Sequence, residues 1–159
     1  MIQKPVKAMK ICLIAPNTRT KNDVSELPLI TPPINLMYLA QSLIEDGNEA
    51  VIIDAYLDNL PLESIANKCI NYNPDIVMIS LYSNDLFVTY TLTNKIKEVL
   101  PNCILILGGH HPTHMPVETL KEFKNVDYVV KGEGEFIIRD VVKSIEKNRK
   151  LNDLGSVAF

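Results

Sequence analysis

Short, continuous apolar runs alternate along the chain with longer segments in which apolar residues recur every three or four positions. The runs are bounded by proline, glycine or polar residues, and such runs are typical of strands buried on both faces of a sheet. The longer segments have the spacing of amphipathic helices. The pattern predicts strands at 10–16, 49–54, 76–80, 103–107 and 127–131, and helices at 34–46, 61–72, 86–99, 116–123 and 134–148.

Five strand–helix units in succession predict an α/β fold. We expect an open doubly wound five-stranded parallel sheet, Rossmann-like or flavodoxin-like, with strand order 2-1-3-4-5 and helices on both faces. Right-handed crossovers place every strand-to-helix loop at the carboxyl edge of such a sheet, where ligands of these folds bind. The candidate chemistry is therefore confined to the loops at 16–33, 55–60, 81–85, 108–115 and 131–134.

The two ends of the chain differ from the rest. We expect residues 1–9 to form a flexible N-terminus and residues 10–148 to form the domain. Residues 149–159 include LNDLGSVAF, which resembles the start of another apolar strand. A strand without a partner is poorly stabilised. We therefore expect either that the natural chain continues or that this tail pairs with something outside the sequence.

Composition and charge narrow the function classes. The 159 residues are 47% hydrophobic and 22% charged, as in a globular domain, and no apolar run approaches membrane-spanning length. A net charge of −3 predicts neither nucleic-acid binding nor a membrane-surface patch. The three cysteines have no CxxC spacing, so a zinc or iron–sulfur site is not expected. Reduced thiols and the lack of a secretory signal in Met1–Lys10 predict a cytoplasmic protein.

The loop after the fourth strand holds all three histidines, in GGHHPTH at residues 108–114. Paired glycines permit positive φ or the close approach of a ligand to the backbone. Three interpretations are open: a loop that lines a ligand site, a metal site, and a plain turn. We favour the ligand site, because adjacent histidines need not converge and no cysteine or carboxylate nearby has metal-ligand spacing.

Two other loops carry polar groups at the same edge. Residues 131–135, KGEGE, combine two glycines with Glu133, whose carboxylate is placed to accept a hydrogen bond from a ligand. The alternative is a glycine turn with an acidic first helical turn. After the third strand, residues 80–85 offer hydroxyl and amide groups, although Ser83, Asn84 or Asp85 could equally cap the next helix. The long first loop, residues 17–33, lacks the glycine motifs of nucleotide-binding loops.

Four segments together resemble one family. TPPINLMYLAQSLIEDGNEAVIIDAY, NPDIVMISLYSN, LPNCILILGGHHPTHMPVETL and VDYVVKGEGEFIIRDVVKSI are similar to the cobalamin-binding N-terminal domain of radical S-adenosylmethionine enzymes. The likeness runs from about residue 10 to residue 147, and GGHHPT followed by GEGE is its specific part. The chain lacks the CxxxCxxC cluster motif, so it cannot cleave S-adenosylmethionine alone. It also lacks the D-x-H-x-x-G motif of many other cobalamin domains.

The resemblance implies a cobalamin-binding domain of a methyltransferase-like enzyme. Cobalamin would lie base-off at the carboxyl edge, without a histidine ligand, with the histidine loop beside its nucleotide tail and the first loop facing the lower side of cobalt. Gly109 and Gly132 would leave room for the tail. Residues 149–159 would begin the linker to a barrel that holds S-adenosylmethionine and a four-iron four-sulfur cluster. No catalytic or metal-ligating residue is expected in this chain. The expected cofactor-binding residues are Asn17, Thr18, Pro33, Asn35, Ser80, Leu81, Tyr82, Ser83, Gly108, Gly109, His110, His111, Thr113, Gly132, Glu133 and Gly134.

Three alternatives come from other classes. A degenerate scaffold domain would keep the fold without the cofactor. A response-regulator receiver would need acidic residues after the first strand and an acceptor aspartate after the third, where the chain has Pro16-Asn17 and Ser80-Leu81. A flavodoxin-like carrier would need a glycine-containing phosphate loop, but no glycine precedes Gly47.

Overall fold

The computed structural model describes residues 8–17, 31–147, 149, 151 and 154–159. The strands are β1 (Lys10–Ala15), β2 (Glu49–Asp54), β3 (Ile76–Ser80), β4 (Ile104–Gly108), β5 (Tyr128–Val130) and β6 (Val157–Ala158). The helices are α1 (Ile34–Glu45), α2 (Leu62–Tyr72), α3 (Leu86–Val99), α4 (His110–His114), α5 (Pro116–Glu122), the 3-10 helix η1 (Gly134–Phe136) and α6 (Ile138–Glu146).

The strands form one sheet in the order β2-β1-β3-β4-β5-β6. β1 to β5 pair in parallel, which confirms the predicted order of these five strands. β6 pairs with β5 in the antiparallel direction, with Val129 opposite Ala158. Because β1 leads to β2 on one side and the later strands are added on the other, the strand order reverses beside β1.

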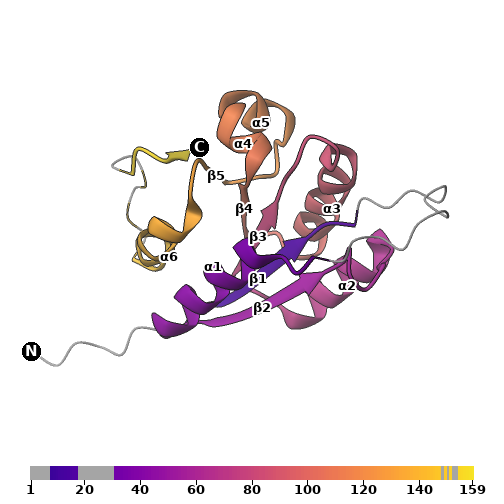
Figure 1. Ribbon diagram of the computed structural model, residues 1–159, viewed down its shortest axis with the longest axis horizontal. Helices are drawn as coiled ribbons and strands as arrows, with labels where there is room; N and C mark the ends of the chain where they lie inside the picture. The colour runs from indigo at the N-terminus through magenta and orange to yellow at the C-terminus, as the bar shows by residue number, and fades with distance from the viewer. Residues whose placement is uncertain (1–7, 18–30, 148, 150, 152–153) are drawn as a thin grey trace, which may run out of the picture.

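Alternate residues of each strand pack into two separate cores. Cys12 and Ile14 face one core with residues of α2 and α3, whereas Ile11 and Leu13 face the other with residues of α1 and α6. Figure 1 shows α1 and α6 on one side of the sheet and α2 and α3 on the other. All five residues of β3 are buried, as expected for a central strand covered on both faces. This double covering explains why the strands have continuous apolar sequences.

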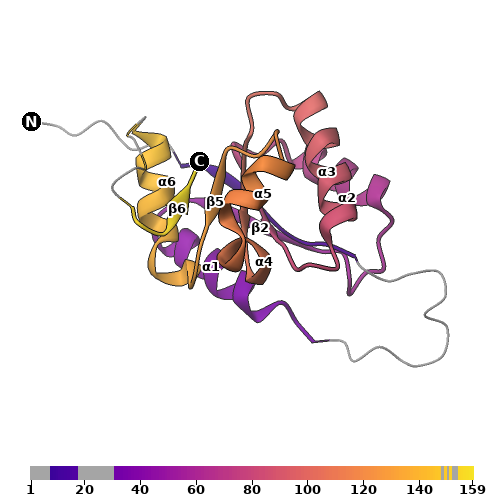
Figure 2. The ribbon, with the colours of Figure 1, turned by 90° about the horizontal axis from the view of Figure 1, so that it is seen from above.

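The structure corrects three predictions about secondary structure. The sheet has six strands and is not wholly parallel, because the C-terminal tail pairs with β5 and needs no partner outside the chain (Figure 2). The loop predicted at 108–115 contains the short helix α4. The helix predicted at 134–148 is divided into η1 and α6. Gly47, with φ of 90°, follows the end of α1, and its N–H donates to Ile44 O.

Candidate functional site

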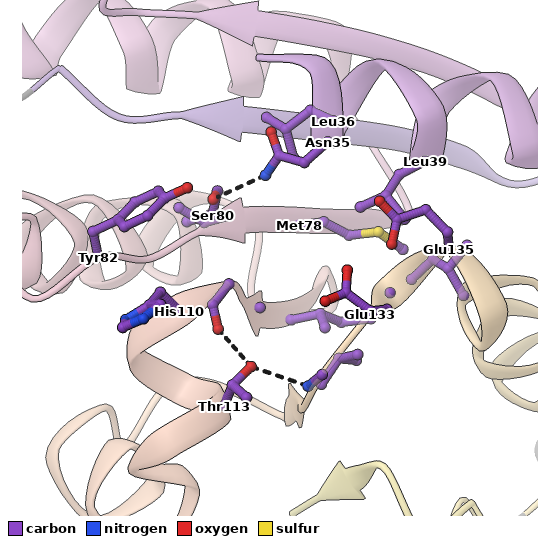
Figure 3. Close-up of a pocket in the computed structure, with 18 of the residues that line it drawn as sticks. Asn35, Leu36, Leu39, Met78, Ser80, Tyr82, His110, Thr113, Glu133 and Glu135 are labelled. Carbon is purple, nitrogen blue, oxygen red and sulfur yellow. Dashed lines mark hydrogen bonds between the residues drawn. The ribbon is translucent and has the colours of Figure 1, made fainter.

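A cavity of about 350 Å³ lies between α1 and α6, over the carboxyl-terminal halves of β3 and β4. It opens at the edge of the sheet where α4 and the loop after β5 meet (Figure 3). It lies at the carboxyl edge of the sheet, the edge at which ligands of open α/β sheets bind. The lining residues are Asn35, Leu36, Leu39, Met78, Ile79, Ser80, Tyr82, Ile106, Gly108, Gly109, His110, Thr113, His114, Val130, Gly132, Glu133, Gly134, Glu135 and Ile138.

The cavity has an apolar floor and a polar rim. Met78, Ile106 and Val130 come from three neighbouring strands, and all three side chains are buried. At the rim, Asn35 Nδ2 donates to Ser80 Oγ over 3.5 Å, which connects the start of α1 to the end of β3. An apolar floor with a few convergent polar groups is typical of sites for small organic ligands.

Thr113 connects α4 to the loop that follows β5. Its Oγ1 donates to Gly109 O at 2.7 Å and accepts from the backbone N–H of Gly132 at 3.0 Å (Figure 3). The two glycine-containing segments that the sequence predicted as site loops are therefore held together by one hydroxyl group. This connection positions the residues after Gly132 on the far wall of the cavity.

The glycines at the rim differ in the atoms that an added Cβ would contact. Gly109 has φ of 105°, and an added Cβ would lie 3.1 Å from Leu81 O and 3.2 Å from Ser80 Oγ. Gly132 has φ of 73°, with no atom within 4 Å of an added Cβ. At Gly134, φ is ordinary and the nearest atom is Leu39 Cδ2 at 3.2 Å, across the cavity wall. Close packing against Leu39 is therefore a reason for glycine at 134, whereas Gly109 is required by its own contact with Ser80 and Leu81.

Two carboxylates, Glu133 and Glu135, point into the cavity (Figure 3). Within the part of the chain that the structure describes, neither side chain has a hydrogen bond or an ion pair. A ligand that filled the cavity would remove water from both groups, and a desolvated carboxylate without a partner is costly. The cavity therefore favours a ligand that presents N–H or O–H donors to this wall.

Asp85 lies behind the rim, at the start of α3. Its Oδ2 accepts from the backbone N–H of Tyr82 at 3.2 Å, and Oδ1 is buried without a hydrogen bond to any described residue. Burial raises the pKa of the Asp85 carboxyl group, and the bond from Tyr82 partly opposes this. Asp85 occupies the N-cap position of α3 but makes no side-chain cap hydrogen bond. Its contact instead shapes the turn that carries Tyr82.

The structure brings most of the predicted site residues together around this cavity. These are Asn35, Ser80, Tyr82, Gly108, Gly109, His110, Thr113, Gly132, Glu133 and Gly134. The resemblance implied that the histidine loop and the first loop lie apart. Asn35, just after the first loop, and His110 line the same cavity, so these two segments lie close together.

The remaining predicted residues lie elsewhere. Pro33 lines a neighbouring hollow of about 340 Å³. Asn17 donates to Leu60 O at 3.0 Å, and Leu81 is buried in the core on the α2 and α3 side. Ser83 and His111 are hydrogen-bonded to each other at 3.0 Å and do not line the cavity. Thr18 lies outside the described residues.

Sequence reasoning missed the floor of the cavity and part of its walls. Leu36 and Leu39 were recognised only as the apolar face of a helix, and Met78, Ile106 and Val130 only as strand residues. Glu135 was interpreted as part of an acidic first helical turn. His114 was noted in the histidine loop but not assigned to the site. The helical periodicity of 34–46 could have identified the α1 residues if the gap between α1 and α6 had been foreseen.

The described residues, 8–17, 31–147, 149, 151 and 154–159, also bear on metal binding and on membrane crossing. No group of three or more His, Cys, Asp or Glu side chains there could hold a metal ion. Within the same residues, no helix combines the length and apolar character that crossing a bilayer requires.

Comparison with known proteins identifies the family. Residues 21–142 match the model of the B12 binding domain. The chain belongs to this family. The B12-binding domain is 31% identical over 155 residues to an uncharacterised methyltransferase of Pyrococcus horikoshii, covering 97% of this chain and 33% of that protein. It is 32% identical over 139 residues to the anaerobic magnesium-protoporphyrin IX monomethyl ester cyclase of Cereibacter sphaeroides, covering 87% of this chain and 22% of that enzyme.

Solved structures show the same fold. The B12-binding domain superposes on TsrM of Kitasatospora setae, a radical S-adenosylmethionine methyltransferase that was solved with cobalamin and a [4Fe-4S] cluster. The TM-score is 0.78 and the sequence identity 17%, over 95% of this chain and 27% of TsrM. The cobalamin-dependent S-adenosylmethionine radical enzyme OxsB, solved without ligands, gives a TM-score of 0.71 and 16% identity over 97% of this chain and 21% of OxsB. The chain thus spans a third or less of the length of these relatives and structural neighbours.

Proposed function

We propose that the domain holds cobalamin with the corrin ring across the carboxyl edge of the sheet and the nucleotide tail in the cavity between α1 and α6. A volume of about 350 Å³ is near the lower end for ligand pockets, so it suits part of the cofactor rather than the whole. The nucleotide tail has an apolar aromatic base and a polar ribose phosphate. The apolar floor and polar rim of the cavity match this division.

Each part of the lining has a role in this arrangement. Met78, Ile106 and Val130 would contact the apolar base. The hydroxyl groups of Ser80 and Thr113 would bind the ribose or the phosphate. Glu133 and Glu135 repel a phosphate, so the phosphate group would lie toward α4. The two carboxylates would then accept hydrogen bonds from ribose hydroxyls or from the side-chain amides of the corrin.

The wall at Gly134 supports this placement most directly. A Cβ atom there would lie 3.2 Å from Leu39 Cδ2, so any side chain at this position would narrow the cavity. Gly134 does not have a positive φ, so the turn does not itself require glycine. Since Leu39 and Gly134 both line the cavity, a larger residue at 134 would displace Leu39 and change the shape of the proposed site.

We further propose that the longer protein carries out methyl transfer. Its relatives include a protein named a methyltransferase, and the matched part is 33% of that protein and 27% of TsrM. A radical S-adenosylmethionine barrel with a four-iron four-sulfur cluster would follow this domain on the same chain. Methyl-group transfer is the chemistry that bound cobalamin would supply. A CxxxCxxC motif encoded downstream of Phe159 would support this organisation, and its absence from the rest of the reading frame would refute it.

The base-off state is tested by electron paramagnetic resonance of the cobalt(II) form bound to the domain. The nucleotide base cannot occupy the cavity and ligate cobalt together, so we expect no superhyperfine splitting from an axial nitrogen. Splitting that persists in His110→Ala, His111→Ala and His114→Ala would show that the base remains on cobalt. Splitting that disappears in one of these variants would show a histidine ligand, which we do not expect.

A further inference from the structure

Two aromatic rings face each other across the mouth of the cavity. The planes of Tyr82 and His110 are within 8° of parallel, and their centroids are 6.5 Å apart. Figure 3 shows one ring above the other, at the end of the cavity opposite Glu135. Carbon atoms in contact are about 3.5 to 4 Å apart. One flat group between two rings needs a separation of about 7 to 8 Å, so Tyr82, whose side chain is half exposed, would have to move outward slightly to admit it.

The backbone fixes the distance between the segments that carry these rings. Leu81 N donates to Gly108 O at 2.8 Å, and His111 N donates to Leu81 O at 3.1 Å. The absence of a side chain at Gly109 permits this close approach, since an added Cβ would be 3.2 Å from Leu81 N. Ser83 Oγ and His111 Nδ1, 3.0 Å apart, connect the same two segments on their outer side. The fold therefore fixes the spacing of the two segments that carry the rings.

The His110 ring has a second aromatic neighbour besides Tyr82. One neighbour is the ring of His114, with a centroid separation of 4.4 Å and a tilt of 36°. His114 is itself fixed, because its Nδ1 is 2.8 Å from His110 O. Tyr82 is half exposed and its ring borders the cavity. His110 thus has support from His114 and lies parallel to Tyr82, which is the arrangement of a stacking site.

We propose that Tyr82 and His110 form a slot that takes one flat, π-bonded group of a corrinoid. The inference rests on the proposed function and adds a binding subsite to it. Two sources in the cofactor share this chemistry: a carboxamide at the edge of the corrin ring and the heteroaromatic base of the nucleotide tail. A ring that stacks on such a group contributes roughly a 2- to 10-fold increase in affinity.

Substitutions at Tyr82 test the slot. Tyr82→Phe keeps the ring, and Tyr82→Leu replaces it with a branched apolar chain. Tyr90→Leu serves as the matched control, because Tyr90 is a similarly exposed tyrosine on α3, away from the cavity. Dissociation constants are measured for hydroxocobalamin and for dicyanocobinamide, which keeps the ring carboxamides but has no nucleotide base. Thermal melts of each variant establish that it is folded.

The two ligands distinguish the two sources. We expect Tyr82→Leu to weaken binding about 5-fold or more, while Tyr82→Phe and Tyr90→Leu bind as the wild type does. Weaker binding of both ligands identifies a carboxamide in the slot, and weaker binding of hydroxocobalamin alone identifies the base. Unchanged binding of both ligands overturns the slot. Equal losses in Tyr82→Phe and Tyr82→Leu also overturn it, because the hydroxyl group rather than the ring would then be responsible.

A small probe tests the slot independently of the cofactor. Nicotinamide has both an aromatic ring and a carboxamide, and at about 10 mM it would populate even a weak site. We expect ring-current shifts of the His110 side-chain resonances in the wild type that are lost in Tyr82→Leu. Absence of these shifts overturns the slot. If the wild type binds no corrinoid but shows the shifts, the proposed function fails while the slot stands.

Discussion

Replacing Gly109 with alanine should destabilise the domain more than alanine at any other glycine of the site. The backbone there has φ of 105° and ψ of −165°, a region that is essentially restricted to glycine and costs other residues about 1–3 kcal/mol. The new Cβ would also lie 3.1 Å from Leu81 O and 3.2 Å from Leu81 N. These backbone atoms cannot move without weakening two hydrogen bonds, each worth about 1 kcal/mol. We expect a total loss of about 3 kcal/mol.

Urea denaturation and thermal melting measure this loss. For a chain of this length, 3 kcal/mol corresponds to a decrease in Tm of roughly 6–12 °C. Gly132→Ala should cost only about 1–2 kcal/mol, because φ of 73° is unfavourable but no atom lies within 4 Å. Gly155→Ala, with ordinary φ and open space, should be neutral. A Gly109→Ala melt within about 2 °C of the wild type would refute the close contact between α4 and β3.

Two further predictions concern buried ionisable groups. Cys12, Cys69 and Cys103 are buried; a hydrogen bond with Cys69, and then burial, raise the pKa of Cys12, and burial raises the pKa of Cys103 to about 12. A thiol-specific disulfide reagent at pH 8 should therefore label none of the three cysteines until urea is added. Rapid labelling of the native protein would contradict their burial. Because burial raises the pKa of Asp85, the stability that its neutral form contributes is complete below the unfolded pKa and is lost as the pH rises through the folded pKa. Urea titrations at increasing pH, starting at about 4, should therefore show Asp85→Asn gaining stability relative to the wild type. A stability difference that does not change with pH would show that this carboxyl group is not desolvated.

The sequence predicted the main strands and helices because the buried positions repeat regularly. Residues 76–80 are apolar almost throughout, and such a run has few alternatives to a strand covered on both faces. The short elements were harder to predict. In α4, Pro112 disfavours a helix, and the turn is stabilised by the hydrogen bond from Thr113 Oγ1 to Gly109 O. β6 depends on pairing with β5, a partner whose availability no local pattern reveals.

The candidate site was only partly predictable for a related physical reason. Polar and glycine residues at strand ends, such as Ser80 and Gly108, mark a ligand-binding edge in any parallel α/β sheet. The floor residues Met78 and Ile106 have the same sequence signature as core residues, and only the gap between α1 and α6 gives them a different role. The sequence also could not distinguish Gly109, whose backbone conformation and contacts require glycine, from Gly134, which packs against Leu39 at the cavity wall.

Equilibrium dialysis with hydroxocobalamin tests the central claim most directly, using the wild type, Gly134→Val and Gly155→Val. The valine at 134 would extend toward Leu39 across the cavity, whereas an added Cβ at 155 has no atom within 4 Å. We predict that the wild type and Gly155→Val retain cobalamin, and that Gly134→Val binds at least about 10-fold more weakly while melting cooperatively. No retention by the wild type at about 100 μM, or equal retention by Gly134→Val, would contradict the placement of the cofactor in this cavity.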